Sequence, residues 1–564
     1  MSTNDFIISN GVLKKYEGSD EHVIIPNSVV SIGDEAFKYC QSIITVEIPN
    51  SVTNIGFSAF FECSNLKYVH IPESVTSIGD LAFTLCSSLE HLTIPRSVKS
   101  IGYKSIQGNK SLAYVEVDPK NKHFTSVDGV LYSKDKSEIL CYPPMREGVS
   151  YSIPASVISI GNSAFSSCQR LESIDIPDSV WVIDQGAFSG CSSLKKMNVP
   201  SNVMNIGAYA FCRCSALEEI SLPKKCMNIA AMAFSGCESL KDIQIPEKLQ
   251  EIEDFLFSGC KSLTKVVIPQ GVKSIGSGAF QECEKLVSIE VPDTVQSIGD
   301  GAFAGCVSLT SIDLPDSLAS IGHSAFANCN SLTSFYVPSS VSLIGERTFA
   351  SCASLHRIDI PDSVESIERY AFSRCGSLEE IEIPESVKKI GDGAFELCDN
   401  CSIVIRANSG DMQYVGDDAF YMCKSIKYRD SRDRYVFISF SSKNLESAEA
   451  ARDLLISEGI DVWMSEYDIL PSVDYMRDIT NTLRHSSCLL LILSEQSQRS
   501  PWVEKEMIMA INLRKPIFTA HIDNSKLNDA FAYALVNSQI TQVNSMTAED
   551  PGFIALLKAI KDLL

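Results

Sequence analysis

The sequence predicts two structural parts, a repeat solenoid over most of its length and a separate α/β domain with a parallel sheet at its end. Three observations lead to this prediction. An apolar residue followed by proline recurs every 23 residues, with one exception, up to residue 383. The recurrence then stops, and strand-like segments alternate with helix-like segments over residues 435–564. The chain of 564 residues is also too long for one compact core.

The repeat is defined by the spacing of these apolar-Pro pairs. They begin at residues 25, 48, 71, 94, 117, 153, 176, 199, 222, 245, 268, 291, 314, 337, 360 and 383, with a loose Val-Asp-Pro at 117. The step of 36 residues after 117 is one repeat with 13 inserted residues. In each unit, L-x-x-I-x-I-P alternates like a short strand that proline ends. The segment S-V-x-x-I-G-x-x-A-F spaces its apolar residues as a helical turn or an irregular coil would.

Self-similarity at this period indicates stacked coils, in which each unit covers the apolar face of the next. The units resemble the BspA-type leucine-rich repeat, a family widespread in bacteria and present in some protists, over about residues 5–428. The resemblance implies a leucine-rich repeat solenoid of about 16 repeats of 23 residues. The implied boundaries are an N-terminal cap over 1–24, the solenoid over 25–423 with a hairpin insertion over 118–152, and a linker over 424–434.

The repeat also accounts for most of the 20 cysteines. Fourteen of them fall on one repeat position, and a fifteenth, Cys423, lies in the last half-repeat. A small thiol at one corner of each coil can fill space and donate a weak hydrogen bond to the backbone. Metal ligation needs convergent clusters, which one cysteine per coil does not supply. We therefore predict packing residues rather than metal ligands or disulfides.

The outward residue between the two strand isoleucines is the candidate ligand contact of the repeats. Seven of the fourteen such positions are acidic, and none is lysine or arginine. A concave acidic stripe favours a basic or polar protein partner, or self-association, over nucleic acid. The alternative is a solvated face that only keeps the strands soluble. The candidate ligand face consists of Glu290, Asp313, Tyr336, Asp359 and Glu382.

Composition and charge exclude several classes of function. With 45% apolar and 21% charged residues, the chain is typical of a folded protein rather than a disordered one. A net charge of −22 predicts a surface that repels nucleic acid and anionic lipid. The N-terminal segment lacks a basic region followed by an apolar stretch, and no apolar run reaches membrane-spanning length. We therefore expect no signal peptide, no membrane contact and a cytoplasmic location.

Residues 435–564 alternate predicted strands and helices. Strands are expected at Tyr435–Phe440, Ile460–Met464, Cys488–Ser494 and Pro516–Ile522, and helices at Leu445–Glu458, Tyr475–Ser486, Pro501–Leu513 and Gly552–Leu564. The pattern over residues 528–543 is not clear. This alternation predicts a parallel sheet with helices on both faces, and ligands in such folds bind at the carboxyl ends of the strands.

These segments resemble a TIR domain, which implies a flavodoxin-like fold. The matching motifs are YVFISFS from residue 435, VW from residue 462, DILP from residue 468, LILS from residue 491 and SPWVEKE from residue 500. The sequence departs from the family at Ser472, where glycine is usual, and at Ser465, where many bacterial members have aspartate. The resemblance implies an assembly loop that docks onto a neighbouring TIR domain through Tyr467, Asp468, Pro471, Ser472 and Tyr475.

TIR domains divide into adaptors that only assemble and enzymes that cleave NAD⁺, and the enzymes resemble one another in a glutamate four residues after a tryptophan. Trp502 and Glu506 fit that pattern. Residues four apart share a helix face, so the ring and the carboxylate would look into one pocket. Ser500 and Pro501 suit the N-cap and first-turn positions, so we expect Glu506 to lie near a helix N-terminus and to be ionised. The alternative is that Glu506 is a solvated helix charge.

The other cofactor contacts follow from the same resemblance. Phe440, Ser441 and Ser442 lie where the end of the first strand would meet NAD⁺, although the arginine that many such enzymes carry in this stretch is absent. Trp463 could stack on a base or belong to the core. Trp502 completes the predicted cofactor-binding set. No metal is predicted, because the eight histidines are scattered without metal-ligand spacing.

Together these features predict a sensor–effector protein. Its repeats would bind a protein partner or self-associate, and its TIR domains would then pack together as a homo-oligomer. Assembly would complete a site in which Glu506 supports cleavage of NAD⁺, the substrate, to nicotinamide and ADP-ribose or a cyclic form. The expected role is bacterial innate immunity, such as antiphage defence. The alternatives are a non-enzymatic scaffold that recruits another TIR protein, and a cell-surface or host-directed effector.

Overall fold

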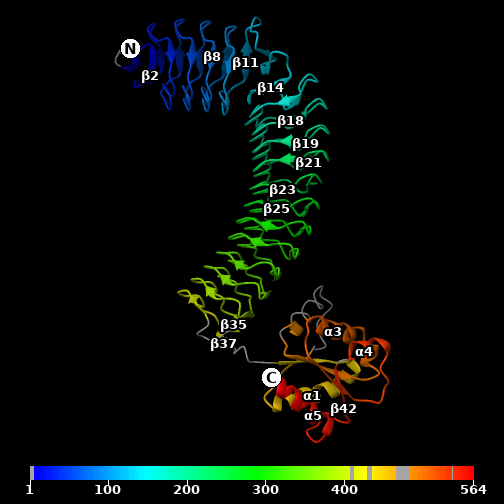
Figure 1. Ribbon diagram of the computed structural model, residues 1–564. Coiled ribbons are helices and arrows are strands. Elements are labelled where there is room, and N and C mark those ends of the chain that lie inside the picture. The colour runs from blue at the N-terminus through cyan, green and yellow to red at the C-terminus, as the bar shows by residue number, and fades with distance from the viewer. Residues whose placement is uncertain are drawn as a thin grey trace. The chain divides into compact units, whose positions relative to one another are not determined.

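The protein divides into two compact units, shown in the computed structural model of Figure 1. The first unit is Met1–Ile405 with Ser409–Lys427, and the second is Arg406–Asn408 with Tyr428–Leu564. The residues that the structure describes are 5–406, 412–428, 435–464, 479, 482–484, 486–536 and 538–564. No helix among these residues is long and apolar enough to cross a membrane.

The first unit is a solenoid of stacked coils, and most of its coils contribute two short strands (Figure 1). The strands of the first set at the apolar-Pro motif are β3 (His22–Ile24), β5 (Thr45–Glu47), β7 (Tyr68–His70), β9 (His91–Ile94), β11 (Tyr114–Val117), β15 (Ser150–Ser152), β17 (Ser173–Asp175), β19 (Lys196–Asn198), β21 (Glu219–Ser221), β24 (Lys265–Val267), β26 (Ser288–Glu290), β29 (Ser334–Tyr336), β31 (Arg357–Asp359) and β33 (Glu380–Ile383). Two strands without the proline, β35 (Ser402–Ile405) and β37 (Ser425–Tyr428), continue the set after β33. Neighbours pair in parallel, with Val46 opposite Val69, which confirms the predicted repeat strand.

A second set of two-residue strands lies in the S-V-x-x-I-G segment. These strands are β4 (Ser31–Ile32), β6 (Asn54–Ile55), β8 (Ser77–Ile78), β10 (Ser100–Ile101), β16 (Ser159–Ile160), β18 (Val182–Ile183), β20 (Asn205–Ile206), β22 (Asn228–Ile229), β23 (Glu251–Ile252), β25 (Ser274–Ile275), β27 (Ser297–Ile298), β28 (Ser320–Ile321), β30 (Leu343–Ile344), β32 (Ser366–Ile367), β34 (Lys389–Ile390) and β36 (Tyr414–Val415). The sequence pattern did not predict them, because two residues are too few to show alternation. The turn that follows is not helical, since residues such as Glu35 (φ 60°) and Tyr39 (φ 63°) are left-handed.

Antiparallel strands begin two of the sheets that continue as parallel ladders. The N-terminal hairpin joins β1 (Phe6–Ser9) to β2 (Val12–Tyr16), and β2 then pairs in parallel with β4. The insertion joins β12 (Phe124–Val127), β13 (Val130–Ser133) and β14 (Glu138–Cys141), and β14 pairs in parallel with β16. Its turn, Asp128-Gly129, has φ values of 50° and 80°, as the Asp-Gly sequence predicts.

Columns of identical side chains fill the interior of the solenoid. The buried phenylalanine rings of successive coils stack, with centroids 5.4 Å apart between Phe188 and Phe211 and between Phe211 and Phe234. The cysteine column donates to the backbone of the preceding coil, as Cys260 Sγ does to the Phe234 carbonyl at 3.3 Å. These contacts confirm that the repeat cysteines are packing residues with weak hydrogen bonds to the backbone.

The second unit contains a parallel sheet with strand order β39-β38-β40-β41-β42 (Figure 1). Its strands are β38 (Tyr435–Ser439), β39 (Asp461–Met464), β40 (Cys488–Leu493), β41 (Ile517–His521) and β42 (Gln539–Gln542). Its helices are α1 (Leu445–Ser457), α3 (Pro501–Asn512), α4 (Asp529–Ala534), α5 (Pro551–Leu563) and the short η2 (Ser442–Asn444) and η3 (Ser497–Arg499). This confirms the predicted α/β fold, and α4 and β42 occupy the stretch whose pattern was not clear. In the predicted helix Tyr475–Ser486, residue 479 and residues 482–484 are helical; residues 475–478, 480, 481 and 485 lie outside the described residues.

Helices cover both faces of this sheet and divide its core in two. On one face, Val436 and Ile438 of β38 pack with residues of α1 and α5. On the other face, Phe437 packs with Val503 and Met507 of α3. Because side chains alternate along a strand, the residue two after Phe437, at the carboxyl end of β38, lies on the α3 face. This is the position at which parallel sheets of this kind hold ligands.

Candidate functional site

The candidate site lies where the carboxyl end of β38 meets α3. This helix begins as the sequence predicts, because the Ser500 hydroxyl accepts a hydrogen bond from the Val503 amide and Pro501 occupies the first helical turn. Its sheet-facing side consists of Val503, Glu506, Met507 and Ala510, all of which are buried. This three- and four-residue spacing is that of one helix face, and it turns Glu506 toward the sheet rather than toward solvent.

Glu506 is 5% exposed, and its carboxylate accepts a hydrogen bond at Oε2 from the Ser439 hydroxyl at 2.5 Å. Ser439 is the last residue of β38 and is itself 1% exposed. Burial raises the pKa of Glu506 to about 7, and the bond from Ser439 opposes that rise. Among the described residues, no basic side chain forms an ion pair with Glu506.

These facts correct two expectations about Glu506. The alternative of a solvated helix charge is wrong, because the side chain is buried. The expectation of a fully ionised Glu506 near a helix N-terminus is corrected too, because burial raises its pKa to about 7 and leaves both the protonated and the ionised form populated at neutral pH. Glu506 is the sixth residue of α3, counting from Pro501. The helix dipole acts within the first turn, so at this depth the cost of burying a charge is the larger effect.

Trp502 does not lie with Glu506 on the buried side of α3. It is 46% exposed, and Lys505 Nζ lies 4.7 Å from the centroid of its ring. The buried face of α3 that holds Glu506 therefore does not include the ring, and a shared pocket for ring and carboxylate stays a prediction. Trp502 is the second residue of α3, where the helix has only begun.

The other predicted cofactor-binding residues are divided between the two faces of the sheet, with Phe440 on one and Trp463 on the other. Phe440 is buried, but in the core on the α1 and α5 face. Ser441 is buried, and Ser442 is exposed at the start of η2. Trp463 stacks on Phe437, with ring centroids 4.6 Å apart, which favours its alternative assignment to the core. The predicted assembly-loop residues lie outside the described residues; they are Tyr467, Asp468, Pro471, Ser472 and Tyr475.

The residue that the structure brings to Glu506 is Ser439, which the sequence analysis contained only within a motif. A signal for it existed in the strand pattern. Alternation along β38 places Phe437 and Ser439 on the same face, so Ser439 turns a hydroxyl toward α3 at the carboxyl end of the strand. What the sequence could not supply was the register of α3 over the sheet.

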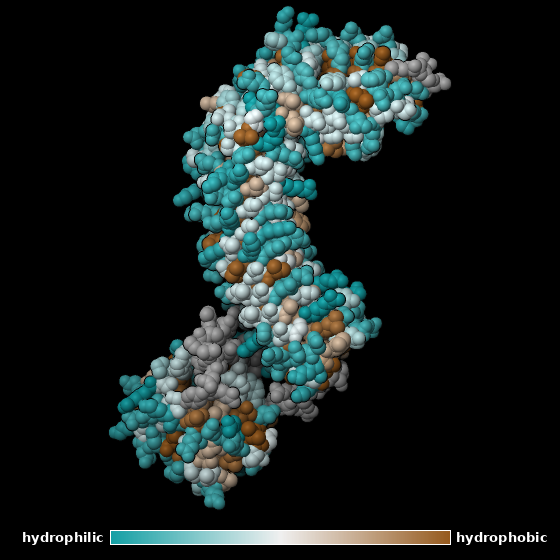
Figure 2. All heavy atoms as spheres, turned by 180° about the vertical axis from the view of Figure 1, so that it is seen from behind, coloured by the Kyte–Doolittle hydropathy of each residue, from teal (hydrophilic) through white to brown (hydrophobic). Residues whose placement is uncertain are grey.

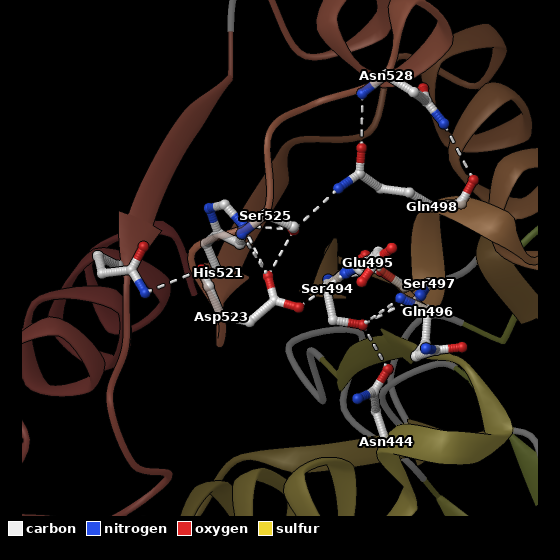
Figure 3. A network of polar contacts seen from close by, with 11 residues as sticks. Asn444, Ser494, Glu495, Gln496, Ser497, Gln498, His521, Asp523, Ser525 and Asn528 are labelled. Carbon is white, nitrogen blue, oxygen red and sulfur yellow. Dashed lines mark hydrogen bonds and ion pairs between the residues drawn. The ribbon is translucent and has the colours of Figure 1, made fainter.

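A polar network ties together the loops that follow the strands at the same edge (Figure 3). Ser494, after β40, accepts hydrogen bonds at its hydroxyl from the amides of Gln496 and Ser497, and donates to Asn444 Oδ1 at 2.7 Å. Asp523, after β41, accepts from the Glu495 amide at 2.8 Å. Three loops that begin at three adjacent strands are therefore held at fixed spacing beside the candidate site.

The same network contains serine, histidine and aspartate side chains that do not form a nucleophilic triad. His521 Nε2 lies 3.3 Å from Asp523 Oδ1 and 3.2 Å from Ser525 Oγ, and Ser525 donates to Asp523 at 2.5 Å (Figure 3). A triad needs the acid and the serine on opposite ring nitrogens. Here both approach one nitrogen, so these residues fix the loop. Burial alone would raise the pKa of Asp523, but hydrogen bonds from Ser525 and the Glu495 amide hold this pKa below its usual value.

The candidate ligand face of the solenoid carries mixed charge. Glu290 and Asp313 are exposed, and Tyr336, Asp359 and Glu382 are partly exposed. Two of its acidic residues contact basic side chains from the repeat position two residues earlier; Lys265 Nζ lies 2.7 Å from Glu290 and Arg357 Nε lies 3.2 Å from Asp359. These two contacts neutralise the predicted acidic stripe at Glu290 and Asp359, whereas Glu380, two residues before Glu382, adds negative charge to it.

Exposed apolar side chains follow a different column, which the sequence analysis missed because it followed only the Ile-x-Ile position. Ile158, Trp181, Met204 and Met227 occupy one position in four successive coils, next to the two-residue strands, and all are exposed. The face drawn in Figure 2 shows hydrophobic patches of the solenoid among hydrophilic residues.

In the described ranges, no three histidine, cysteine, aspartate or glutamate side chains lie close enough together to bind a metal ion.

Comparison with known families assigns both units. The model of the BspA type leucine rich repeat region, in six copies, matches residues 7–128, 148–263, 250–375 and 319–442. The TIR domain model matches residues 436–555. No curated protein matches the chain.

Several solved bacterial structures are similar to parts of the chain. A leucine-rich repeat protein from Eubacterium ventriosum is 26% identical with a TM-score of 0.42, and the match covers 56% of this chain and 88% of that one. A leucine-rich repeat protein from Bacteroides ovatus is 28% identical with a TM-score of 0.41, and the match covers 75% of this chain and 97% of that one. A leucine rich cell surface protein from Faecalibacterium prausnitzii is 26% identical with a TM-score of 0.34, covering 76% and 93%. The family matches carry the assignment, and the repeat match spans more than half of the sequence. The chain belongs to the BspA-type leucine-rich repeat family and carries a C-terminal TIR domain.

Proposed function

We propose that this TIR-containing signalling or defence protein cleaves NAD⁺ when its solenoid binds a partner or assembles, and that Glu506 is the catalytic carboxylate. The observation that carries the proposal is a buried glutamate at the carboxyl edge of the parallel sheet. It is held by one hydroxyl and, within the described residues, is not neutralised by a basic side chain. A buried carboxylate of this kind is costly to the fold, and such groups are typical of functional sites.

The chemistry needs a fixed negative charge more than it needs an acid. When the bond between ribose C1′ and the nicotinamide nitrogen breaks, its electron pair neutralises the pyridinium ring, so nicotinamide leaves as a neutral molecule. The positive charge then develops on the ribose, where a carboxylate can stabilise it. Water adds to C1′ and loses a proton to give ADP-ribose; an internal nucleophile of the same molecule would give a cyclic product instead.

The raised pKa of Glu506 suits a cationic substrate. At neutral pH the carboxyl group is divided between its protonated and ionised forms, because its pKa is about 7. A positive charge placed beside the group favours the ionised form. Binding of the nicotinamide–ribose cation would therefore generate the charged carboxylate at the moment that the reaction needs it.

The solenoid supplies the proposed control. Leucine-rich repeats bind proteins and TIR domains associate with one another, so partner binding or self-association of the repeats would bring TIR domains together as a homo-oligomer. We place this activity in the cytoplasm and in defence against phage, where loss of cellular NAD⁺ would stop growth of an infected cell. Fractionation of the native host would test the location.

The test is nicotinamide release from NAD⁺ by the purified full chain, alone and clustered through an antibody against an added tag. We expect release on clustering and a loss of at least about 100-fold in Glu506→Gln. Glu504→Gln is the matched control, because Glu504 is only partly buried and lies two residues earlier on the same helix. No release under clustering, or equal release from Glu506→Gln, would overturn the proposal.

One observation favours a second candidate, a non-enzymatic scaffold. Phe440 packs in the core on the opposite face of the sheet, and Trp463 stacks on Phe437 in the core beneath α3, so two of the predicted cofactor-binding side chains serve core packing. An adaptor needs no cofactor-binding side chains. Under this candidate, clustering would leave NAD⁺ intact while a second TIR protein is still recruited.

A further inference from the structure

We propose that Ser439 is a positioning residue for Glu506, holding Oε2 so that Oε1 is the carboxylate oxygen presented to a substrate. For its catalytic consequence the inference rests on the proposed NAD⁺ cleavage. It goes beyond that function by assigning a role to a residue outside the catalytic and cofactor-binding sets predicted from the sequence. The contact itself is a property of the fold and can be tested without any activity.

The hydroxyl of Ser439 is presented by a rigid element. Ser439 ends β38, and its backbone pairs with Leu491 of β40, the central strand, all of whose residues are buried. The serine side chain is therefore fixed on the sheet face beneath α3. Its bond to Glu506 joins two buried groups that are 67 residues apart in the chain. A contact between a strand and a helix packed on it holds an atom more closely than a loop could.

The bond also acts on the charge of Glu506. Burial favours the protonated carboxyl group, whereas a donated hydrogen bond favours the carboxylate. The two effects oppose one another at Glu506, and burial is the larger. Removing the hydroxyl would leave burial unopposed, so the carboxylate would form only at a higher pH.

Other ionisable groups near α3 do not account for this behaviour. Those on the elements packed against it are Tyr435 on β38, Cys488 on β40, His521 on β41, Arg499 on η3, Asp529 and Tyr533 on α4, and Glu504 and Lys505 on α3 itself. Within the described part of the chain, the shift of Glu506 has burial and the Ser439 bond as its causes. A change in the titration of Glu506 therefore indicates a change either in its burial or in its hydrogen bond from Ser439.

The sheet provides a matched control residue. Thr519 of β41 is opposite Leu491, so Ser439, Leu491 and Thr519 form one row across three adjacent strands. Thr519 is fully buried like Ser439, and its hydroxyl has no hydrogen-bond partner among the described residues. Thr519→Val removes a buried hydroxyl from the same row without removing a hydrogen bond from Glu506.

The experiment compares Ser439→Ala, Ser439→Thr and Thr519→Val in the full chain. Infrared difference spectra against Glu506→Gln give the midpoint at which Glu506 titrates. We expect Ser439→Ala to raise this midpoint by about one pH unit, Ser439→Thr to restore it, and Thr519→Val to leave it in place. The acid limb of the kcat/KM profile for NAD⁺ should move with the midpoint, lowering kcat/KM about fivefold at pH 7 in Ser439→Ala.

The outcomes separate this inference from the proposed function. An unchanged midpoint in folded Ser439→Ala would overturn the inference even if the wild type cleaves NAD⁺. A moved midpoint with an unmoved kcat/KM profile would also overturn it, because the contact would then be structural only. If the wild type releases no nicotinamide under clustering, the proposed function fails, and the midpoint alone decides whether Ser439 sets the charge of Glu506. Unfolding curves for each variant show whether the protein is folded. If Ser439→Ala is not folded, Ser439→Cys takes its place, because a thiol is a weaker donor than a hydroxyl, and an unmoved midpoint in that variant overturns the inference.

Discussion

The solenoid and the TIR domain both place a hydrogen-bond donor beneath packed apolar side chains, but they use it in opposite ways. In the solenoid, a cysteine thiol donates to the backbone of the coil before it, and the contact recurs from coil to coil, as in Cys237 and Cys260. In the TIR domain, Ser439 donates to Glu506 once. In the solenoid, many equivalent contacts each add a little to stability. In the TIR domain, the single pair of Ser439 and Glu506 holds a buried carboxylate, which is costly to the fold but able to take part in chemistry.

The largest expected effect is loss of an interior ring from the solenoid. Phe211 is fully buried and stacks on the rings of both neighbouring coils. We expect Phe211→Ala to cost 3–5 kcal/mol, about the usual value for a buried phenylalanine, measured as lost hydrogen-exchange protection in its own and adjacent coils. Phe420→Ala is the control, because Phe420 is only partly buried and stacks on Phe395 at the end of the column. An equal cost at both positions would contradict the expectation that each coil is stabilised by contacts with its two neighbouring coils.

The next effect is a gain of stability in the TIR domain. The pKa of Glu506 is raised from its usual value of 4.5 to about 7, so folding favours its protonated form. Its contribution to stability is complete below pH 4.5 and is lost as the pH rises through 7. We expect Glu506→Gln, which cannot ionise, to raise the free energy of unfolding at pH 8 by about 3 kcal/mol.

Denaturant curves followed by tryptophan fluorescence would measure this gain. The chain has three tryptophans, and a Trp181→Phe background leaves Trp463 and Trp502, both in the TIR domain, as reporters. At pH 4 the two proteins should differ little. A Glu506→Gln variant that is less stable than the parent at pH 8 would mean that the ionised carboxylate is stabilised by a group other than Ser439.

The same contrast explains what could be predicted from the sequence. The repeat strand and the cysteine column were predicted because each signal is repeated in many coils, so chance agreement is averaged out. The two-residue strands were missed because they carry no pattern of their own. In the TIR domain, the caps of α3 were predicted from Ser500 and Pro501, since capping is local. The partner and charge of Glu506 were not, because both depend on how a helix is placed on a strand 67 residues away.

A smaller effect is expected from one member of the cysteine column. Cys260→Ala removes a buried sulfur and a weak bond to the Phe234 carbonyl, and should cost about 1 kcal/mol. Burial raises the pKa of Cys260 to about 12, and its neighbours are also buried, so thiol reagents should reach them only when a coil opens. We expect labelling of Cys283, in the next coil, to become about fivefold faster in the variant, while the distant Cys63 stays at its wild-type rate.

The smallest expected effect lies on the outward face of the solenoid. Lys265 and Glu290 form an ion pair in which both side chains are more than half exposed. Such pairs contribute little, so we expect Lys265→Ala to change hydrogen-exchange protection by less than about 0.5 kcal/mol, with little dependence on salt. The variant leaves Glu290 unneutralised and makes the candidate ligand face more acidic without disturbing the core. A loss of protection above about 1 kcal/mol would show that the outward side chains stabilise the solenoid as the phenylalanine column does. Residues on which the solenoid depends in this way could not be exchanged freely to suit a binding partner.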